Sequence, residues 1–349
     1  MASQKTPYFI LDKEKLESNY KEFNEQCERF LGKDRFEIAY SVKTNSLPEV
    51  IKILSSHGSG FEVASLGEIK LVNKSKGLKI FNGPCKTMQE VKLALKDKML
   101  INVDSISEIN KISSLIKKPL DACLRVSFLD SKFGINELQV KSTLEYAKTK
   151  KINIVGLHFH LGTQQNLKEY EENLIMFENL LGRLTKEYKF NFMDVGGGFP
   201  DKQQLKNIGK TLEDYLLVIK NYLGKFNAKI ILEPGRAIVS DSMILVTKVQ
   251  VIKENLGKNY AILDAGINLL PKITLASYKF SKFHADKNET KEKSKEYWFA
   301  GPLLFSNDIL GKFQGNLNEG DLIKVENVGA YCLNLAWGIS YGVPRVVLV

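Results

Sequence analysis

Short apolar runs alternate with amphipathic stretches along the first two thirds of the chain. Stretches such as Glu90–Leu95 and Tyr170–Leu184 have helical periodicity. The runs between them are rich in Val, Ile and Phe and have the length of strands: Phe36–Val42, Gly60–Val63, Ile80–Asn82, Leu100–Val103, Ala122–Ser127, Gly156–His160, Phe192–Val195 and Lys229–Glu233. Eight strands that alternate with helices predict an α/β fold, the parallel (β/α)8 barrel.

The pattern changes after about residue 240. Helical periodicity fades, and β-rich runs separated by turn residues follow at Met243–Ile252, Tyr260–Leu263, Tyr297–Ala300, Asp321–Val325 and Arg345–Val349. They predict a mainly antiparallel β domain, which we expect the strand-like Pro7–Leu11 to join. The predicted organisation is a barrel over residues 22–241 and a β domain made of residues 1–21 and 242–349, with a mobile polar loop at Asp286–Lys295.

Composition excludes several classes of protein. The 349 residues are 44% hydrophobic and contain no apolar run near the roughly 18 residues that a membrane span needs. No secretion signal precedes the barrel, and the four cysteines are widely spaced without a Cys-x-x-Cys motif, so we expect a cytoplasmic protein without a metal site. The net charge of +10 comes from lysines spread along most of the chain, which favours a solvated surface over nucleic-acid binding.

Polar residues stand where the predicted strands end, which is where catalytic residues gather in such barrels. These strand ends carry Lys43, Glu62, Arg125, His160, Gly196–Gly198, Glu233 and Gly235-Arg236. A triple glycine lets backbone N–H groups approach an anion, and the arginine adds a bidentate donor. A phosphate site after strands seven and eight recurs in this fold, so the two glycine segments predict one here.

A lysine, a phosphate loop, a histidine and a carboxylate are the parts that a pyridoxal 5'-phosphate enzyme needs. Lys43 would form a Schiff base with the cofactor aldehyde, and burial at the strand end would favour this by lowering its pKa. Glu233 would keep the pyridine nitrogen protonated, and His160 would stack on the ring. Taken singly, a snorkelling lysine and a structural histidine are the simpler interpretations; their joint occurrence favours the cofactor.

Short motifs along the chain carry a family resemblance. They are YSVKTN (40–45), GFEVASLGEI (60–69), FNGPCKT (81–87), SKFGI (131–135), GLHFHLGTQ (156–164), DVGGGFP (194–200), EPGR (233–236), LDAGIN (263–268), GP (301–302) with Asp308, and GAYC (329–332). In this order, and over nearly the whole chain, they resemble the fold-type III pyridoxal phosphate decarboxylases. That group acts on ornithine, diaminopimelate, arginine and carboxynorspermidine.

The resemblance implies a role for each matching residue. Lys43 matches the Schiff-base lysine, His160 the ring-stacking histidine and Glu233 the carboxylate on the pyridine nitrogen. Glu62 stands where the family usually carries an aspartate near the cofactor. The implied phosphate contacts are Thr163, Gly196, Gly197, Gly198, Gly235, Arg236 and Tyr331. The family also implies a head-to-tail homodimer whose sites each receive residues 301–308 of the other chain, and substrate contacts at Arg125, Phe305, Asp308 and Tyr331.

Residues 301–308 depart from the family pattern of Gly-Pro-x-Cys followed by an acidic residue. Leu304 replaces the cysteine and cannot donate a proton to Cα after CO2 leaves, so Lys43, Cys332 or a water is expected to do so. Phe305 replaces the acid and offers an ammonium only a cation–π face. We therefore expect a specialised amino-acid substrate, linked to a carrier, peptide or nucleotide as in antibiotic biosynthesis, rather than ornithine or diaminopimelate.

Other functions stay open. A basic amino-acid, polyamine-type or diaminopimelate-type decarboxylase is the first alternative. An amino-acid racemase is disfavoured because Asn45 is followed by Ser-Leu-Pro-Glu and not by a Tyr-Gly-His-Gly-like run. A non-catalytic pyridoxal phosphate-binding protein would leave the C-terminal β domain unexplained, and a catalytically weakened relative is suggested by Leu304.

Overall fold

The computed structural model describes residues 5–160, 162–164, 166–271, 275–283 and 294–349. The chain divides into two compact units, which we call the barrel unit (residues 17–238) and the β unit (residues 1–16 and 239–349). The domain boundaries expected from the sequence, after residues 21 and 241, lie a few residues further along the chain than those of the structure, after residues 16 and 238. Helix α1 (Lys13–Leu31) continues through the first boundary, so no break in structure marks it.

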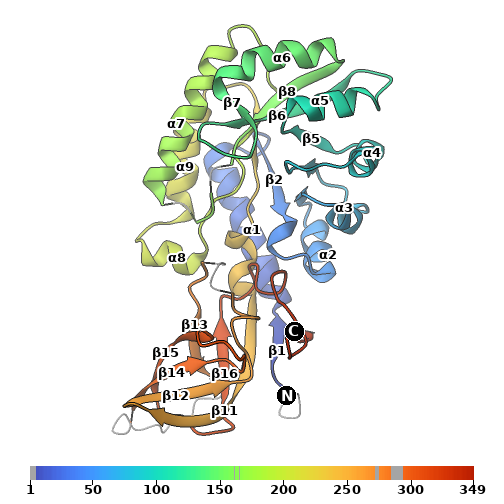
Figure 1. Cartoon of the computed structure of the whole chain (residues 1–349). Coiled ribbons are helices and arrows are strands. Elements are labelled where there is room, and N and C mark those ends of the chain that lie inside the picture. The colour runs from blue at the N-terminus through green and yellow to red at the C-terminus, as the bar shows by residue number, and fades with distance from the viewer. Residues whose placement is uncertain (1–4, 161, 165, 272–274, 284–293) are drawn as a thin grey trace. The chain divides into compact units, whose positions relative to one another are not determined.

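Within the described residues, the barrel unit contains a closed barrel of eight parallel strands (Figure 1), which confirms the predicted (β/α)8 fold. The spatial order is β5-β4-β3-β2-β10-β9-β8-β6, and pairing of β5 with β6 closes the circle. The strands are β2 (Phe36–Ser41), β3 (Gly60–Val63), β4 (Lys79–Phe81), β5 (Leu100–Val103), β6 (Leu120–Ser127), β8 (Ile152–His158), β9 (Phe192–Asp194) and β10 (Lys229–Leu232); the short β7 (Ile135–Asn136) pairs only with β6.

The connections between strands are helical. They contain η1 (Val42–Thr44), α2 (Pro48–Ser56), α3 (Leu66–Val72), α4 (Met88–Lys96), α5 (Ile106–Ser113), η2 (Glu137–Gln139), α6 (Val140–Thr149), α7 (Leu167–Leu184), α8 (Lys202–Asn207) and α9 (Leu212–Leu223), and α10 (Arg236–Val239) and η3 (Ser240–Ser242) follow the last strand. Local sequence explains their starts: Thr87 and Glu90 form a capping box at α4, and Pro48 opens α2. Helix α7 buries Tyr170, Leu174, Phe177 and Leu181, the spacing of one helical face.

One apolar residue from each barrel strand packs below the carboxyl end of the barrel. We call these the apolar set: Ala39, Gly60, Ile80, Leu100, Cys123, Gly156, Phe192 and Ile231. Successive side chains of a strand point to opposite faces, so the residue two positions later lies on the same face of the sheet. The identity of those later residues therefore decides the chemistry at the barrel mouth.

The β unit is built on a mainly antiparallel sheet of order β13-β16-β11-β12-β14-β15, and β1 pairs with β11 and with β17. Only the β1–β17 and β12–β14 pairings are parallel among its described strands. The strands are β1 (Tyr8–Leu11), β11 (Met243–Asn255), β12 (Lys258–Leu263), β13 (Lys279–Lys282), β14 (Lys295–Ala300), β15 (Ile309–Gly315), β16 (Leu322–Glu326) and β17 (Val346–Leu348).

The pairing of β1 with β11 confirms that the N-terminal strand joins the C-terminal sheet. Strands β13 and β15 were not predicted. Most of the predicted loop at Asp286–Lys295 lies outside the described residues, and Lys295 itself begins β14. Among the described helices, none combines the length and the apolar character that crossing a membrane requires.

Candidate functional site

Eight buried polar side chains lie at the carboxyl end of the barrel, one contributed by each strand. We call them the polar set: Ser41, Glu62, Asn82, Asn102, Arg125, His158, Asp194 and Glu233. Each comes two residues after a member of the apolar set, and none is more than 7% exposed. The sequence pattern therefore places an apolar floor and a polar layer on the same interior face of the barrel.

Lys43 follows the first of these strands and lies in η1, one residue beyond the predicted strand end. Its Nζ donates to Glu62 Oε2 at 2.6 Å, and Ser41 Oγ donates to the same oxygen at 2.5 Å. The Lys43 side chain is 42% exposed whereas that of Glu62 is 1% exposed. The expectation of a buried lysine is thus wrong: the amine lines a pocket of about 580 Å³ and is held there by a buried carboxylate.

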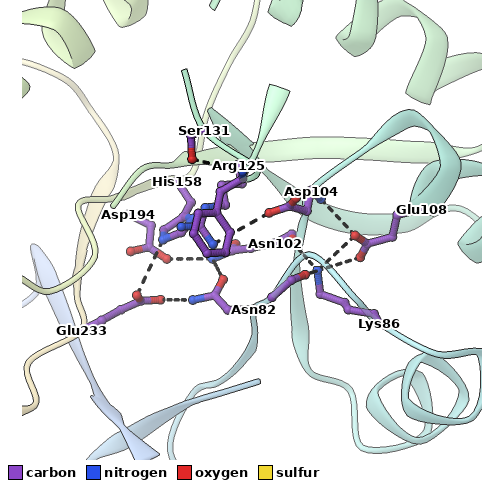
Figure 2. Close-up of polar contacts among 12 residues, drawn as sticks. Asn82, Lys86, Asn102, Asp104, Glu108, Arg125, Ser131, His158, Asp194 and Glu233 are labelled. Carbon is purple, nitrogen blue, oxygen red and sulfur yellow. Dashed lines mark hydrogen bonds and ion pairs between the residues drawn. The ribbon is translucent and has the colours of Figure 1, made fainter. Parts of the chain in front are cut away.

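Glu233 belongs to a chain of side-chain hydrogen bonds that Figure 2 shows. Asn82 Nδ2 donates to Glu233 Oε1 at 2.8 Å, and Asn102 Nδ2 donates to Asn82 Oδ1 at 2.7 Å and to Asp194 Oδ2 at 3.1 Å. An oxygen from each of Glu233 and Asp194 and a nitrogen of His158 lie within 4.8 Å of one another. Amide side chains therefore connect two buried carboxyl groups.

Two carboxylates at this separation cannot both ionise cheaply. At an effective dielectric constant of about 20, two like charges within 4.8 Å of each other repel by at least roughly 3 kcal/mol. Burial, and then the nearby charge of Glu233, raise the pKa of Asp194 well above its usual range. Both causes therefore disfavour the ionised form of Asp194.

The glycine loop follows β9 and contacts this network. Asp194 Oδ1 accepts a hydrogen bond from Gly196 N at 2.9 Å, and His160 Nδ1 accepts one from Gly197 N at 3.2 Å. A Cβ on Gly197 would lie 2.6 Å from the Glu233 carbonyl oxygen, so only glycine allows this approach of two strand ends. The loop thus brings backbone N–H groups, a histidine ring and Glu233 into one place.

His158 and His160 stay uncharged at neutral pH. Burial lowers the pKa of His160 to about 4, with the charge of Lys43 as the next cause. Burial lowers the pKa of His158 well below its usual range. Because Nδ1 of His160 accepts a hydrogen bond, its neutral ring carries its proton on Nε2. A flat, neutral ring is suited to stack on an aromatic cofactor.

The second glycine segment packs on the first strand end. Gly235 lies so close to Thr44 Oγ1 that a Cβ there would overlap it, and Arg236 Nε donates to Thr163 Oγ1 at 3.1 Å. Arg236 is buried. The structure therefore brings together all the predicted phosphate contacts of the barrel unit on the strand ends of β8, β9 and β10.

Arg125 lines the same pocket as Lys43 and Glu233. Its Nη1 is 3.8 Å from Asp104 Oδ1, and its guanidinium covers the Phe133 ring at 4.3 Å from the centroid. Behind it, Lys86 and Glu108 form a buried ion pair at 2.9 Å. Leu129, Pro84 and Phe133 also line the pocket and give it an apolar side.

The remaining predicted residues belong to the β unit. Phe305 packs against Trp337 with the ring centroids 6.0 Å apart, and the adjacent Leu304 is fully exposed. Asp308 is buried and accepts hydrogen bonds from Ile267 N at 2.8 Å and Leu303 N at 2.9 Å. This carboxylate therefore shapes the turn of residues 301–308, and its predicted contact with substrate stays a prediction, as do those of Phe305 and Tyr331.

Sequence reasoning missed the partners of the predicted site residues. It gave no role to Asn82, Asn102, Asp194, Lys86 or Glu108. Asn82 and Lys86 lie within the motif FNGPCKT and Asp194 opens DVGGGFP, so the motifs contained them. The offset of two residues from each apolar strand position is the signal that would have found all of the polar set.

The residues present fit pyridoxal 5'-phosphate. Lys43 presents an exposed amine for an aldehyde, and Glu233 presents a carboxylate for a ring nitrogen. The glycine segments leave space for a phosphate, and Arg236 supplies a positive charge for it. The Cβ atoms that glycine lacks at Gly196 and Gly197 would fill the cradle around His160. The donor set thus suits a phosphorylated pyridine aldehyde.

Comparison with known proteins gives a consistent result. Residues 13–240 match the family model described as "Pyridoxal-dependent decarboxylase, pyridoxal binding domain". Diaminopimelate decarboxylase of Aquifex aeolicus is 30% identical over 84% of this chain and 76% of its own length, and that of Helicobacter pylori is 30% identical over 96% and 87%. The crystal structure of a Helicobacter pylori diaminopimelate decarboxylase variant complexed with L-lysine superimposes with a TM-score of 0.87, at 26% identity, over 99% of this chain and 92% of its own.

Proposed function

The chain belongs to the pyridoxal-dependent decarboxylases and is a pyridoxal phosphate-dependent amino-acid decarboxylase, and from this premise we propose that it removes one carboxyl group of a diaminopimelate-type substrate. The observation that supports a site on this chain is the meeting of Lys43, Glu233 and the glycine loop at the barrel mouth. When bound, the cofactor accepts the electron pair that the departing CO2 leaves on the substrate Cα.

The chain's own residues would divide the work as follows. Lys43 supplies the amine for the cofactor aldehyde, and Glu62, bonded to its Nζ, orients that amine and takes or returns a proton there. Glu233 holds the pyridine nitrogen in its protonated form. The space that the glycine segments leave and the buried guanidinium of Arg236 would hold the phosphate, and the neutral ring of His160 keeps the cofactor plane fixed.

The pocket walls would direct the bond that breaks. A carboxylate becomes neutral CO2 as it leaves, so an apolar wall that excludes water favours the departing state over the bound one. Phe133, Leu129 and Pro84 line such a wall. Arg125, buried beside Phe133, is suited to hold a second carboxylate of the substrate by a charge-assisted hydrogen bond.

The comparisons favour diaminopimelate over the specialised substrate expected from residues 301–308. Two relatives matched at 30% identity are diaminopimelate decarboxylases. Leu304 and Phe305 still differ from the family pattern, so we infer that other groups protonate Cα and bind the distal amine. Cys332 is fully buried with its Sγ 3.2 Å from Tyr278 Oη, which makes Lys43 or a water the better proton donor.

We also propose that two copies of the chain form the head-to-tail dimer of this family, with residues 301–308 entering the partner's site. On the β unit, exposed apolar side chains gather in this segment and in residues 335–343, where Trp337, Ile339 and Tyr341 are exposed. Tyr341 Oη donates to the Pro302 carbonyl at 3.4 Å, so the two segments lie together. A cytoplasmic location stays a prediction from the cysteine usage.

Release of labelled CO2 tests the proposed substrate. Wild-type protein loaded with pyridoxal phosphate is incubated with carboxyl-labelled diaminopimelate, lysine, ornithine and arginine, and Lys43→Ala serves as the inactive control. We expect diaminopimelate to give a kcat/KM at least about tenfold above the others. Faster release from ornithine or arginine would overturn the substrate assignment, and release by Lys43→Ala would overturn the site.

A further inference from the structure

Hydrogen bonds connect Glu233 to Asn82, Asn102 and Asp194 in one buried assembly. The proposed chemistry gives these three partners no role. Asn82 Nδ2 has a carboxylate oxygen of Glu233 as its acceptor, and Asn82 Oδ1 is occupied by Asn102. This leaves Asn82 only one amide orientation, with its N–H toward Glu233. This N–H restricts the carboxylate at Oε1, and Oε2 lies 3.6 Å from His158 Nε2.

Asn102 is itself fixed from two sides. Its Nδ2 donates to both Asn82 and Asp194, and its backbone carbonyl accepts from Lys86 Nζ at 2.8 Å. Asn102 and Asp194 are fully buried, and Asn82 is 5% exposed, so solvent water does not compete for these hydrogen bonds. The assembly is therefore pre-organised by the barrel and does not depend on a ligand.

Asp194 connects the assembly to the phosphate loop. Its Oδ2 accepts from Asn102, and its Oδ1 accepts from Gly196 N, the first N–H of the glycine loop. The same carboxyl group thus connects Asn102 to the glycine loop. Around Glu233 stand Asn82 from the end of β4, His158 from β8 and Asp194 from β9, and Lys43 and Arg125 line the same pocket.

We propose that Asn82, Asn102 and Asp194 are positioning residues, which hold the Glu233 carboxylate through one hydrogen-bonded chain and orient it toward the pyridine nitrogen. The proposal rests on the role of Glu233 given under the proposed function and explains how that role is achieved. Each link of this chain is an amide N–H that donates to an oxygen, so removing one amide releases the Glu233 carboxylate from the chain.

The direction of each hydrogen bond fixes the order of this chain. Glu233 Oε1 accepts from Asn82, and Asn82 Oδ1 accepts from Asn102. Both oxygens of Asp194 accept N–H donors, one from Asn102 and one from Gly196. An asparagine in place of Asp194 would set its NH2 group against one of these donors, so Asp194→Asn should disturb the chain at its far end, whereas removing the amide of Asn82 should disturb it at Glu233.

The experiment uses full-length protein loaded with pyridoxal phosphate that carries a 15N-labelled ring nitrogen. The NMR shift of that nitrogen reports whether it is protonated, and steady-state kinetics gives kcat and KM. The variants are Asn82→Leu, Asp194→Asn and Glu233→Gln. Asn153→Leu is the matched control, because Asn153 donates only to the exposed Asp121 on the outside of the barrel.

We expect Asn82→Leu to move the ring nitrogen toward its neutral shift and to lower kcat at least about tenfold, with KM changed less than about twofold. Asp194→Asn, which sets an NH2 group against the Asn102 or Gly196 N–H, should move the shift in the same direction by a smaller amount. If Asn82→Leu does not fold, as judged by circular dichroism, Asn82→Ala takes its place.

The outcomes separate this proposal from the proposed function. If Glu233→Gln leaves the ring-nitrogen shift unchanged, the role of Glu233 fails and the positioning proposal fails with it. If Glu233→Gln moves the shift but Asn82→Leu behaves like Asn153→Leu, only the positioning proposal is overturned. It is also overturned if Asp194→Asn leaves the shift where Asn153→Leu leaves it.

Discussion

Acid should destabilise the cofactor-free protein through His160. The folded protein lowers the pKa of this side chain from 6.5 to about 4, mainly by burial. Below pH 6.5 the unfolded chain therefore binds a proton that the folded chain does not, and the free energy of unfolding falls as pH falls. Because the folded state lowers the pKa of this histidine, the ring contributes almost nothing to the free energy of unfolding near pH 7 and lowers it increasingly toward pH 4.

The size of the effect follows from the two pKa values. One pKa unit corresponds to about 1.36 kcal/mol, and the linkage relation gives a loss of about 2 kcal/mol at pH 5 and about 3 kcal/mol at pH 4. Protonation at Nδ1 also removes the acceptor of the Gly197 N–H, so the glycine loop loses its hydrogen bond in the same range. His158, whose pKa is lowered in the same direction, adds to the loss.

Urea unfolding of the apoprotein at pH 7, 6 and 5 measures this effect. We compare wild type with His160→Gln, which cannot titrate at this position. From pH 7 to pH 5 the stability of His160→Gln relative to wild type should rise by about 2 kcal/mol. A constant difference between His160→Gln and wild type would refute the claim that burial keeps this ring neutral.

Three further predictions concern the barrel. Lys86→Met should lower the free energy of unfolding by about 3–5 kcal/mol, because it leaves Glu108 buried without its cation. Adding Glu108→Leu should recover most of this loss in urea unfolding, and a double variant as unstable as Lys86→Met would contradict the prediction. Gly197→Ala should weaken pyridoxal phosphate binding at least about tenfold in a fluorescence titration, because its Cβ would meet the Glu233 carbonyl. Gly182→Ala on α7, where a Cβ meets open space, should leave the affinity unchanged, and equal affinities of the two variants would contradict the prediction. Arg125→Met should raise KM for diaminopimelate at least about tenfold with unchanged cofactor affinity, and an unchanged KM would exclude a substrate contact.

Sequence pattern predicted the barrel because each of its strands is a short apolar run bounded by turns. The strands that were missed lack this signal. Strand β13 reads Lys-Phe-Ser-Lys, and only its Phe280 packs on the core of the β unit. Strand β15 mixes Gly, Lys and Gln with apolar residues and has no fully buried position. Pairing with neighbouring strands, rather than their own composition, makes both into strands.

The sequence predicted those site residues whose type and position indicate one kind of chemistry. A lysine after a strand, a triple glycine and a Glu-Pro-Gly-Arg segment do so, but an asparagine has many uses. Asn82 gains its role only because closure of the barrel brings it to Glu233, 151 positions away. Likewise, the exposure of Lys43 follows from the 3-10 turn after β2, which carries its amine out of the strand and into the pocket.

The identity of the cofactor lysine is the most direct test of this site. Loaded wild-type protein is reduced with borohydride, digested and mapped by mass spectrometry. The pyridoxyl phosphate adduct should be found on the peptide that contains Lys43, and Lys43→Ala should yield no adduct there and no labelled CO2. An adduct on Lys86 or on any other lysine of the wild-type protein, with Lys43 unmodified, would contradict the proposed active site.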